Sequence, residues 1–135
     1  MRHRKRTLKL GRPSAHRRLM LANLTCSLIQ HGRVTTTRAK AKAVRQLADK
    51  MMTLAKDGSL HARRRAISIL HDPLAVRRLF GELVEDHRER PGGYTRIMHL
   101  AKARVGDGSE MSVLEWSGPY AGPKAKKAAA VEAEA

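Results

Sequence analysis

The sequence has 135 residues, of which 28 are Lys or Arg and 12 are Asp or Glu, giving a formal net charge of +16 at pH 7. This length and a hydrophobic content of 41% suffice for one domain with a single modest core. Such a charge is not that of an ordinary soluble enzyme and indicates a nucleic acid, since no run of 18 apolar residues and no basic face paired with large aromatics points to a membrane.

The positive charge is concentrated in the amino-terminal third. Residues 1–48 contain no Asp or Glu and hold 13 of the 28 Lys and Arg. Residues 1–12 offer only Leu8 and Leu10 as apolar anchors, so we expect a basic arm that is disordered when free and ordered by RNA. The candidate RNA contacts of this arm and of the residues after it are Arg2, His3, Arg4, Lys5, Arg6, Lys9, Arg12, His16, Arg17 and Arg18.

The next segment predicts a helix that anchors the core. Ser14 follows Pro13 and is the expected N-cap, while Gly32 is the expected stop. At 100° per residue its large apolar side chains fill a wide arc with Leu24 and Leu28 near the middle, so we expect cover on two sides. Cys26 has no disulfide or metal-site partner, which favours a small apolar filler in a cytoplasmic protein.

A short strand and a second helix follow. The triple threonine that ends residues 33–37 favours extended backbone there, and Thr36 or Thr37 is the expected cap of a helix over residues 38–57 that Gly58 ends. The apolar residues of this helix recur at helical spacing. Its amino-terminal end adds three candidate phosphate contacts, Arg38, Lys40 and Lys42.

Two shorter helices are expected next. Ser59 is the predicted cap of one through Leu70, and Asp72 with Pro73 predicts the start of another through about Asp86. The triplet of residues 63–65, all Arg, fits solvated charge and phosphate contact equally well.

The carboxyl half predicts a β-hairpin. Residues 94–105 read as a strand, residues 106–109 as a turn and residues 110–116 as a second strand. By strand parity Arg96, Lys102 and Arg104 share one face, which is either a second cationic patch or a solvated surface.

These elements give an α+β fold of about four helices packed with a small three-stranded mixed sheet that ends in the carboxyl-terminal β-hairpin. We expect an RNA-binding arm (1–12), one domain (13–118) and a disordered tail rich in Ala, Lys and Glu (119–135).

No catalytic, cofactor or metal motif is present. The seven His are scattered, and the sequence has no HExxH, no Gly-rich phosphate loop and no nucleophile elbow, so we expect no enzyme and no small-molecule substrate. The four aromatics, Phe80, Tyr94, Trp116 and Tyr120, do not form the stacking platform of an RNA recognition motif. Contacts to phosphates and to RNA shape are therefore expected.

Several short motifs, weak singly but specific in their order and spacing, carry a family resemblance over roughly residues 1–116. They are Met1-Arg2-His3-Arg4-Lys5, His16-Arg17, Thr35-Thr36 before Lys40-Ala41-Lys42, Leu54-Ala55-Lys56, and Gly92-Gly93-Tyr94-Thr95-Arg96-Ile97. With them the chain resembles the bacterial large-subunit ribosomal protein seventeen family. The resemblance implies an α+β domain bound to large-subunit ribosomal RNA, near the outer end of the polypeptide exit tunnel and beside other ribosomal proteins.

The hypothesis is therefore a structural constituent of the large ribosomal subunit that binds its RNA through phosphate and shape contacts and supports translation. The alternative is a free-standing basic protein that compacts DNA or RNA, because charge alone does not distinguish the nucleic acids.

Overall fold

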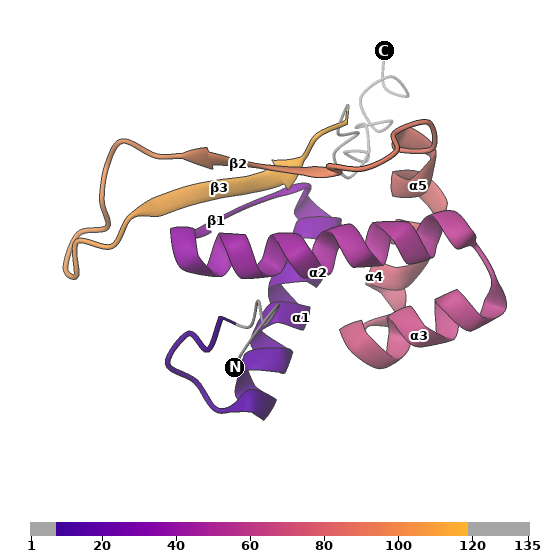
Figure 1. Cartoon of the computed structure of the whole chain (residues 1–135), viewed down its shortest axis with the longest axis horizontal. Helices are drawn as coiled ribbons and strands as arrows, with labels where there is room; N and C mark the ends of the chain where they lie inside the picture. The colour runs from indigo at the N-terminus through magenta and orange to yellow at the C-terminus, as the bar shows by residue number, and fades with distance from the viewer. Residues whose placement is uncertain (1–7, 119–135) are drawn as a thin grey trace, which may run out of the picture.

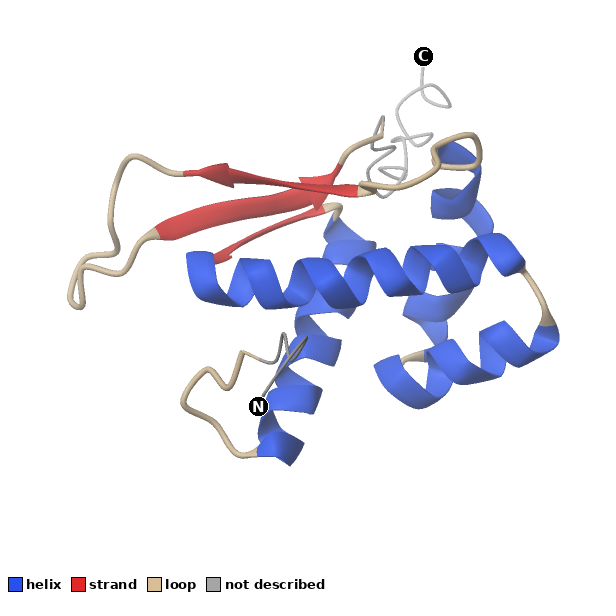
Figure 2. Ribbon diagram, in the orientation of Figure 1, coloured by secondary structure: helices blue, strands red, loops and turns tan. Residues whose placement is uncertain are grey.

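The helices pack against one face of a small sheet, and the hairpin loop projects beyond them (Figures 1 and 2). The computed structural model describes residues 8–118. Its elements are α1 (Ser14–His31), β1 (Arg33–Thr37), α2 (Arg38–Asp57), α3 (Leu60–Leu70), α4 (Pro73–Arg78), the π-helical turn η1 (Leu79–Leu83), α5 (Val84–Asp86), β2 (Thr95–His99) and β3 (Met111–Trp116). Because α4, η1 and α5 follow one another without a break, they correspond to the single fourth helix that the sequence predicts.

The helix stops are confirmed. Gly32 and Gly58 adopt left-handed backbone, with φ of 76° and 67°, and the N–H of each donates to the carbonyl four residues earlier. At the amino-terminal ends, Ser59 Oγ accepts from the Ala62 N–H and the Asp72 carboxylate accepts from two N–H groups of α4, as predicted. The cap assigned to Ser14 is wrong, because Pro13 already has extended backbone (ψ 152°) at the cap position and Ser14 is the first helical residue.

The sheet has the order β1-β3-β2, and both of its pairings are antiparallel. The predicted hairpin of β2 and β3 is confirmed, whereas the predicted mixed sheet is wrong. β1 and β2 do run in the same direction, but β3 lies between them, so the two parallel strands are never neighbours.

The first strand of the hairpin is shorter than predicted. β2 ends at His99, and the ladder closes one bond later, where the Leu100 N–H donates to the Met111 carbonyl. Beyond this bond the Arg104 N–H donates to the Ser109 carbonyl, and the Gly108 N–H donates to the Arg104 carbonyl, within a local turn. Residues 100–110 are therefore a loop, and the parity that placed Lys102 and Arg104 on a strand face does not apply.

The core lies where α1, α2 and the inner face of the sheet meet. Leu28, Ile29 and Met52 are fully buried, and Trp116 from β3 donates its indole N–H to the Leu28 carbonyl over 3.1 Å. This contact joins the last strand to the middle of the core. Leu24, expected at the centre of the buried arc, is only half-buried.

Part of the buried face that the sequence assigns to Leu24 is formed by its polar neighbours on α1. Thr25 and Cys26 are buried instead, and their side chains donate to the carbonyls of Leu21 and Leu70. The buried arc of α1 is therefore shifted towards residues whose polar groups find partners inside the protein.

Candidate nucleic-acid interface

The chain before α1 turns back along this helix (Figure 1). Arg17 Nη1 donates to the carbonyls of Lys9, at 3.4 Å, and Arg12, at 3.3 Å, while Arg12 Nη1 donates to the Leu10 carbonyl. Arg12 and Arg17 therefore hold the described end of the arm in place, whereas Lys9, His16 and Arg18 are exposed. Five predicted contacts lie outside the described residues: Arg2, His3, Arg4, Lys5 and Arg6.

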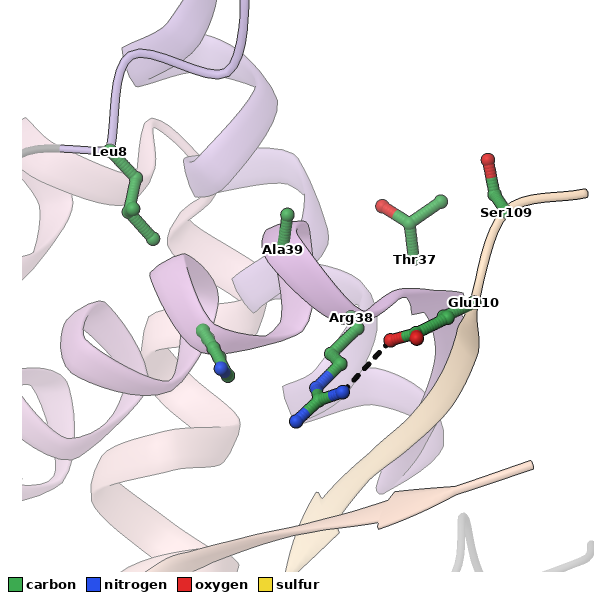
Figure 3. Close-up of a pocket in the computed structure, with 7 residues that line it drawn as sticks. Leu8, Thr37, Arg38, Ala39, Ser109 and Glu110 are labelled. Carbon is green, nitrogen blue, oxygen red and sulfur yellow. Dashed lines mark hydrogen bonds and ion pairs between the residues drawn. The ribbon is translucent and has the colours of Figure 1, made fainter. Parts of the chain in front are cut away.

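The start of α2 forms the second part of the site. A pocket of about 590 Å³ lies between this helix end, Leu8 and the end of the hairpin loop, with Lys42 and Arg38 in its lining (Figure 3). The first turn of α2 carries no acidic residue, and Thr37 caps it without a side-chain hydrogen bond. Backbone N–H groups at the positive end of the helix dipole favour an anion, and the lysines beside them add to this preference.

The arm connects these two groups of cations. Leu8 lines the pocket together with Lys42 of α2, and the next residue, Lys9, is held by Arg17 of α1. We define the amino-terminal cationic surface by the members whose side chains neither donate a hydrogen bond nor have a carboxylate within 4 Å among residues 8–118: Lys9, His16, Arg18, Lys40 and Lys42.

Arg38, at the edge of this surface, is neutralised inside the protein. Its guanidinium donates to Glu110 over 2.9 Å, the bond shown in Figure 3, and this lowers the pKa of the Glu110 carboxyl. The pair is exposed and contributes little to stability. A phosphate at Arg38 must nevertheless displace a carboxylate, which is not required at Lys40 or Lys42.

The predicted second cationic patch does not form a strand face. Arg96 lies on β2 and pairs with Glu115, while Arg104 lies in the hairpin loop and pairs with Asp107, whose pKa the hydrogen bonds from Arg104 and Ser109 lower strongly. Within residues 8–118 Lys102 has no carboxylate partner, so it is the member of this set whose charge is uncompensated.

The sequence revealed only part of this neutralisation. Arg104 and Asp107 are three residues apart, a spacing that suggests a local pair, whereas 72 positions separate Arg38 from Glu110. Of the arginine triplet, Arg63 lies over the Phe80 ring at 5.3 Å and the other two are exposed. Both readings of the triplet stay open.

Other kinds of site find no support in the described part of the chain. Between residues 8 and 118 no three His, Cys, Asp or Glu are placed to hold a metal ion, and no helix there is long and apolar enough to cross a membrane. Cys26 is buried, and burial raises the pKa of its thiol to about 11, which disfavours the reactive thiolate.

Comparison with known proteins gives two findings. A family model described as "Ribosomal protein L17" matches residues 20–117. The "Large ribosomal subunit protein bL17" of Methylacidiphilum infernorum (isolate V4) is 47% identical over 131 residues, which cover 95% of this chain and 99% of that protein.

Proposed function

The chain belongs to the ribosomal protein L17 family, and from this we propose that it is a structural constituent of the large ribosomal subunit that binds large-subunit ribosomal RNA and supports translation. The family resemblance predicted from the sequence motifs is confirmed, and with it the prediction that the chain is a ribosomal protein rather than an enzyme.

The observation that carries the RNA-binding part of this proposal is the amino-terminal cationic surface. Its side chains come from the arm, the start of α1 and the start of α2, and none of them forms an ion pair within 4 Å with a carboxylate among residues 8–118. Uncompensated cations around a helix amino terminus attract phosphates, and binding releases the counterions that the RNA had condensed.

The aromatic residues support contacts to phosphate and shape rather than to bases through stacking. Tyr94 and Trp116 are buried in the core, at 6% and 2% exposure, and Phe80 is half-buried under Arg63. No Phe, Tyr or Trp ring between residues 8 and 118 is therefore free to serve as a stacking platform.

The family also suggests neighbouring large-subunit proteins near the exit tunnel as partners. Exposed apolar side chains in the described region, such as Leu60, Leu74 and Val105, are candidate contacts for them. We retain the division into an arm (1–12), a domain (13–118) and a tail (119–135) as part of the proposal, with residues 1–7 and 119–135 outside the described structure.

Sedimentation separates this function from that of a free-standing basic protein that compacts DNA or RNA. We expect a tagged full-length chain to remain with large subunits in a high-salt sucrose gradient and to crosslink to large-subunit ribosomal RNA. Release from the subunits in salt, with recovery on the nucleoid, would refute the proposal.

A further inference from the structure

A second groove, of about 520 Å³, lies where α1, α2 and α3 meet. It is separate from the pocket at the start of α2. The half-buried side chains of Leu21, Leu47 and Ile69 form an apolar floor. Each of the three comes from a different helix, and each is packed at the edge of the core, so the floor is a fixed part of the fold.

The rim of this groove is cationic. Arg18 of α1 and Lys50 of α2 line it, and neither has a carboxylate within 4 Å among residues 8–118. His71, the left-handed residue that ends α3, also borders the groove, and no Asp or Glu lines it. The occupant that this chemistry fits combines an apolar body with negative charge.

Two polar side chains add hydrogen-bonding capacity. The exposed Gln46 amide forms no hydrogen bond within the described residues, so its NH₂ and its oxygen are both free. The Ser68 hydroxyl donates to the Arg65 carbonyl at 2.8 Å, which leaves its oxygen as an acceptor. A donor and two acceptors at the mouth of an apolar groove match the edge of a nucleobase.

We propose that this groove receives one unstacked nucleotide of the bound RNA, with the base on the apolar floor and a phosphate at Arg18 or Lys50. The inference rests on the proposed function and adds a site that reads a base. It favours RNA over an acidic peptide because Arg18 belongs both to the groove and to the amino-terminal cationic surface, so that one RNA strand reaches from the surface into the groove. Single-stranded RNA is commonly recognised through bases splayed out in this way.

Three variants of the full-length chain test the groove. Ser68→Trp fills its mouth, and Gln46→Ala removes the amide at an exposed helical position where Ala is well tolerated. Thr35→Trp is the matched control, since it adds the same indole at an exposed position of β1, on the sheet face that points away from α2. Binding to a transcript of large-subunit ribosomal RNA is measured over a salt series, and circular dichroism checks each fold.

We expect Ser68→Trp to weaken binding about tenfold. Gln46→Ala should weaken it about fivefold, which is the change in affinity that the loss of one typical hydrogen bond produces. Gln46→Ala removes neither a charge nor a phosphate contact, so its slope of log K against log salt should stay as in the wild type, and Thr35→Trp should bind as the wild type does. In a transcript containing 4-thiouridine, ultraviolet crosslinks should map to peptides that contain Gln46 or Ser68.

Two results would refute the nucleotide site in the groove without refuting the proposed function. One is wild-type affinity of Gln46→Ala and Ser68→Trp together with weakened binding by a Lys40→Ala/Lys42→Ala variant. The other is normal RNA binding by Ser68→Trp but failure of this variant to enter reconstituted large subunits, which would assign the groove to a protein neighbour. Failure of the wild-type chain to bind the transcript would refute the proposed function itself.

Discussion

Removal of Lys40 and Lys42 provides the sharpest test of the amino-terminal cationic surface. Both lysines lie in the first two turns of α2 and neither has a carboxylate partner among residues 8–118. Each phosphate contact changes the slope of log K against log salt by about 0.7 to 0.9 units. The double change to Ala should therefore flatten the slope by about 1.4 to 1.8 units and weaken binding about 25- to 60-fold at 0.1 M salt.

Arg38 supplies the internal comparison because it lies on the same helix end but is already paired. Arg38→Ala removes a cation together with the need to displace Glu110, so its effect on the slope should be smaller than that of either lysine. Glu110→Gln should have the opposite effect on binding, because it frees the Arg38 guanidinium and so should raise RNA affinity at low salt.

Fluorescence anisotropy of a labelled ribosomal RNA fragment between 50 and about 300 mM salt measures these slopes, and circular dichroism confirms that each variant is folded. Arg17 is kept intact in all variants, because its loss would also release the arm that it holds. An unchanged slope for the folded double-lysine variant would show that these residues line a solvated face. A larger effect of Arg38→Ala than of the lysines would refute the argument from ion pairing.

Three further predictions concern the fold. Leu28→Ala should lower the free energy of unfolding by about 3 to 5 kcal/mol and Leu24→Ala by only about 1 to 2 kcal/mol, because Leu28 is fully buried and Leu24 is not; denaturant unfolding that gives equal losses would contradict this difference in packing. Burial raises the pKa of Asp49, so the folded state gains stability from the protonated carboxyl below the unfolded pKa and loses this stability as the pH rises through the folded pKa. Asp49→Asn should therefore raise Tm at pH 7, and this gain in Tm should fade below about pH 4. A gain in Tm that does not depend on pH would exclude this cause. The thiol of Cys26, with a pKa near 11 instead of 9.0, should react with a disulfide reagent at pH 8 at least about a hundredfold more slowly in the folded chain than in denaturant, and equal rates would place it at the surface.

Local signals in the sequence predicted the helices well. Gly32, Gly58, Ser59 and Asp72 are helix-end residues whose role depends on their own backbone or on neighbours two or three positions away, so their meaning is visible in the sequence. The hairpin had a similar local basis, with the turn near Gly106 between two apolar runs.

Features that depend on distant contacts escaped prediction. The antiparallel character of the whole sheet follows from the insertion of β3 beside β1, and no residue pattern within either strand specifies this order. The strand-like sequence pattern continues after His99, although the hydrogen-bonded ladder closes one bond later, so the pattern predicted a β2 that is too long. The neutralisation of Arg38 by Glu110 and of Arg96 by Glu115 depends on the same long-range pairing, which is why both arginines were counted with the free cations.

The central place of β3 in the sheet bears on the order of events during synthesis. β1 is translated early, yet its hydrogen-bonding partner β3 is the last strand within residues 8–118, and β2 depends on the same strand. Contacts between such distant segments form late in folding because a large loop must first be closed. The helices, whose hydrogen bonds are local, are thus free to assemble as they emerge, whereas the sheet and the Trp116 anchor wait until nearly the whole chain has been made. The RNA contacts proposed for the arm, α1 and α2 use residues outside the sheet, so they do not require the sheet to have formed.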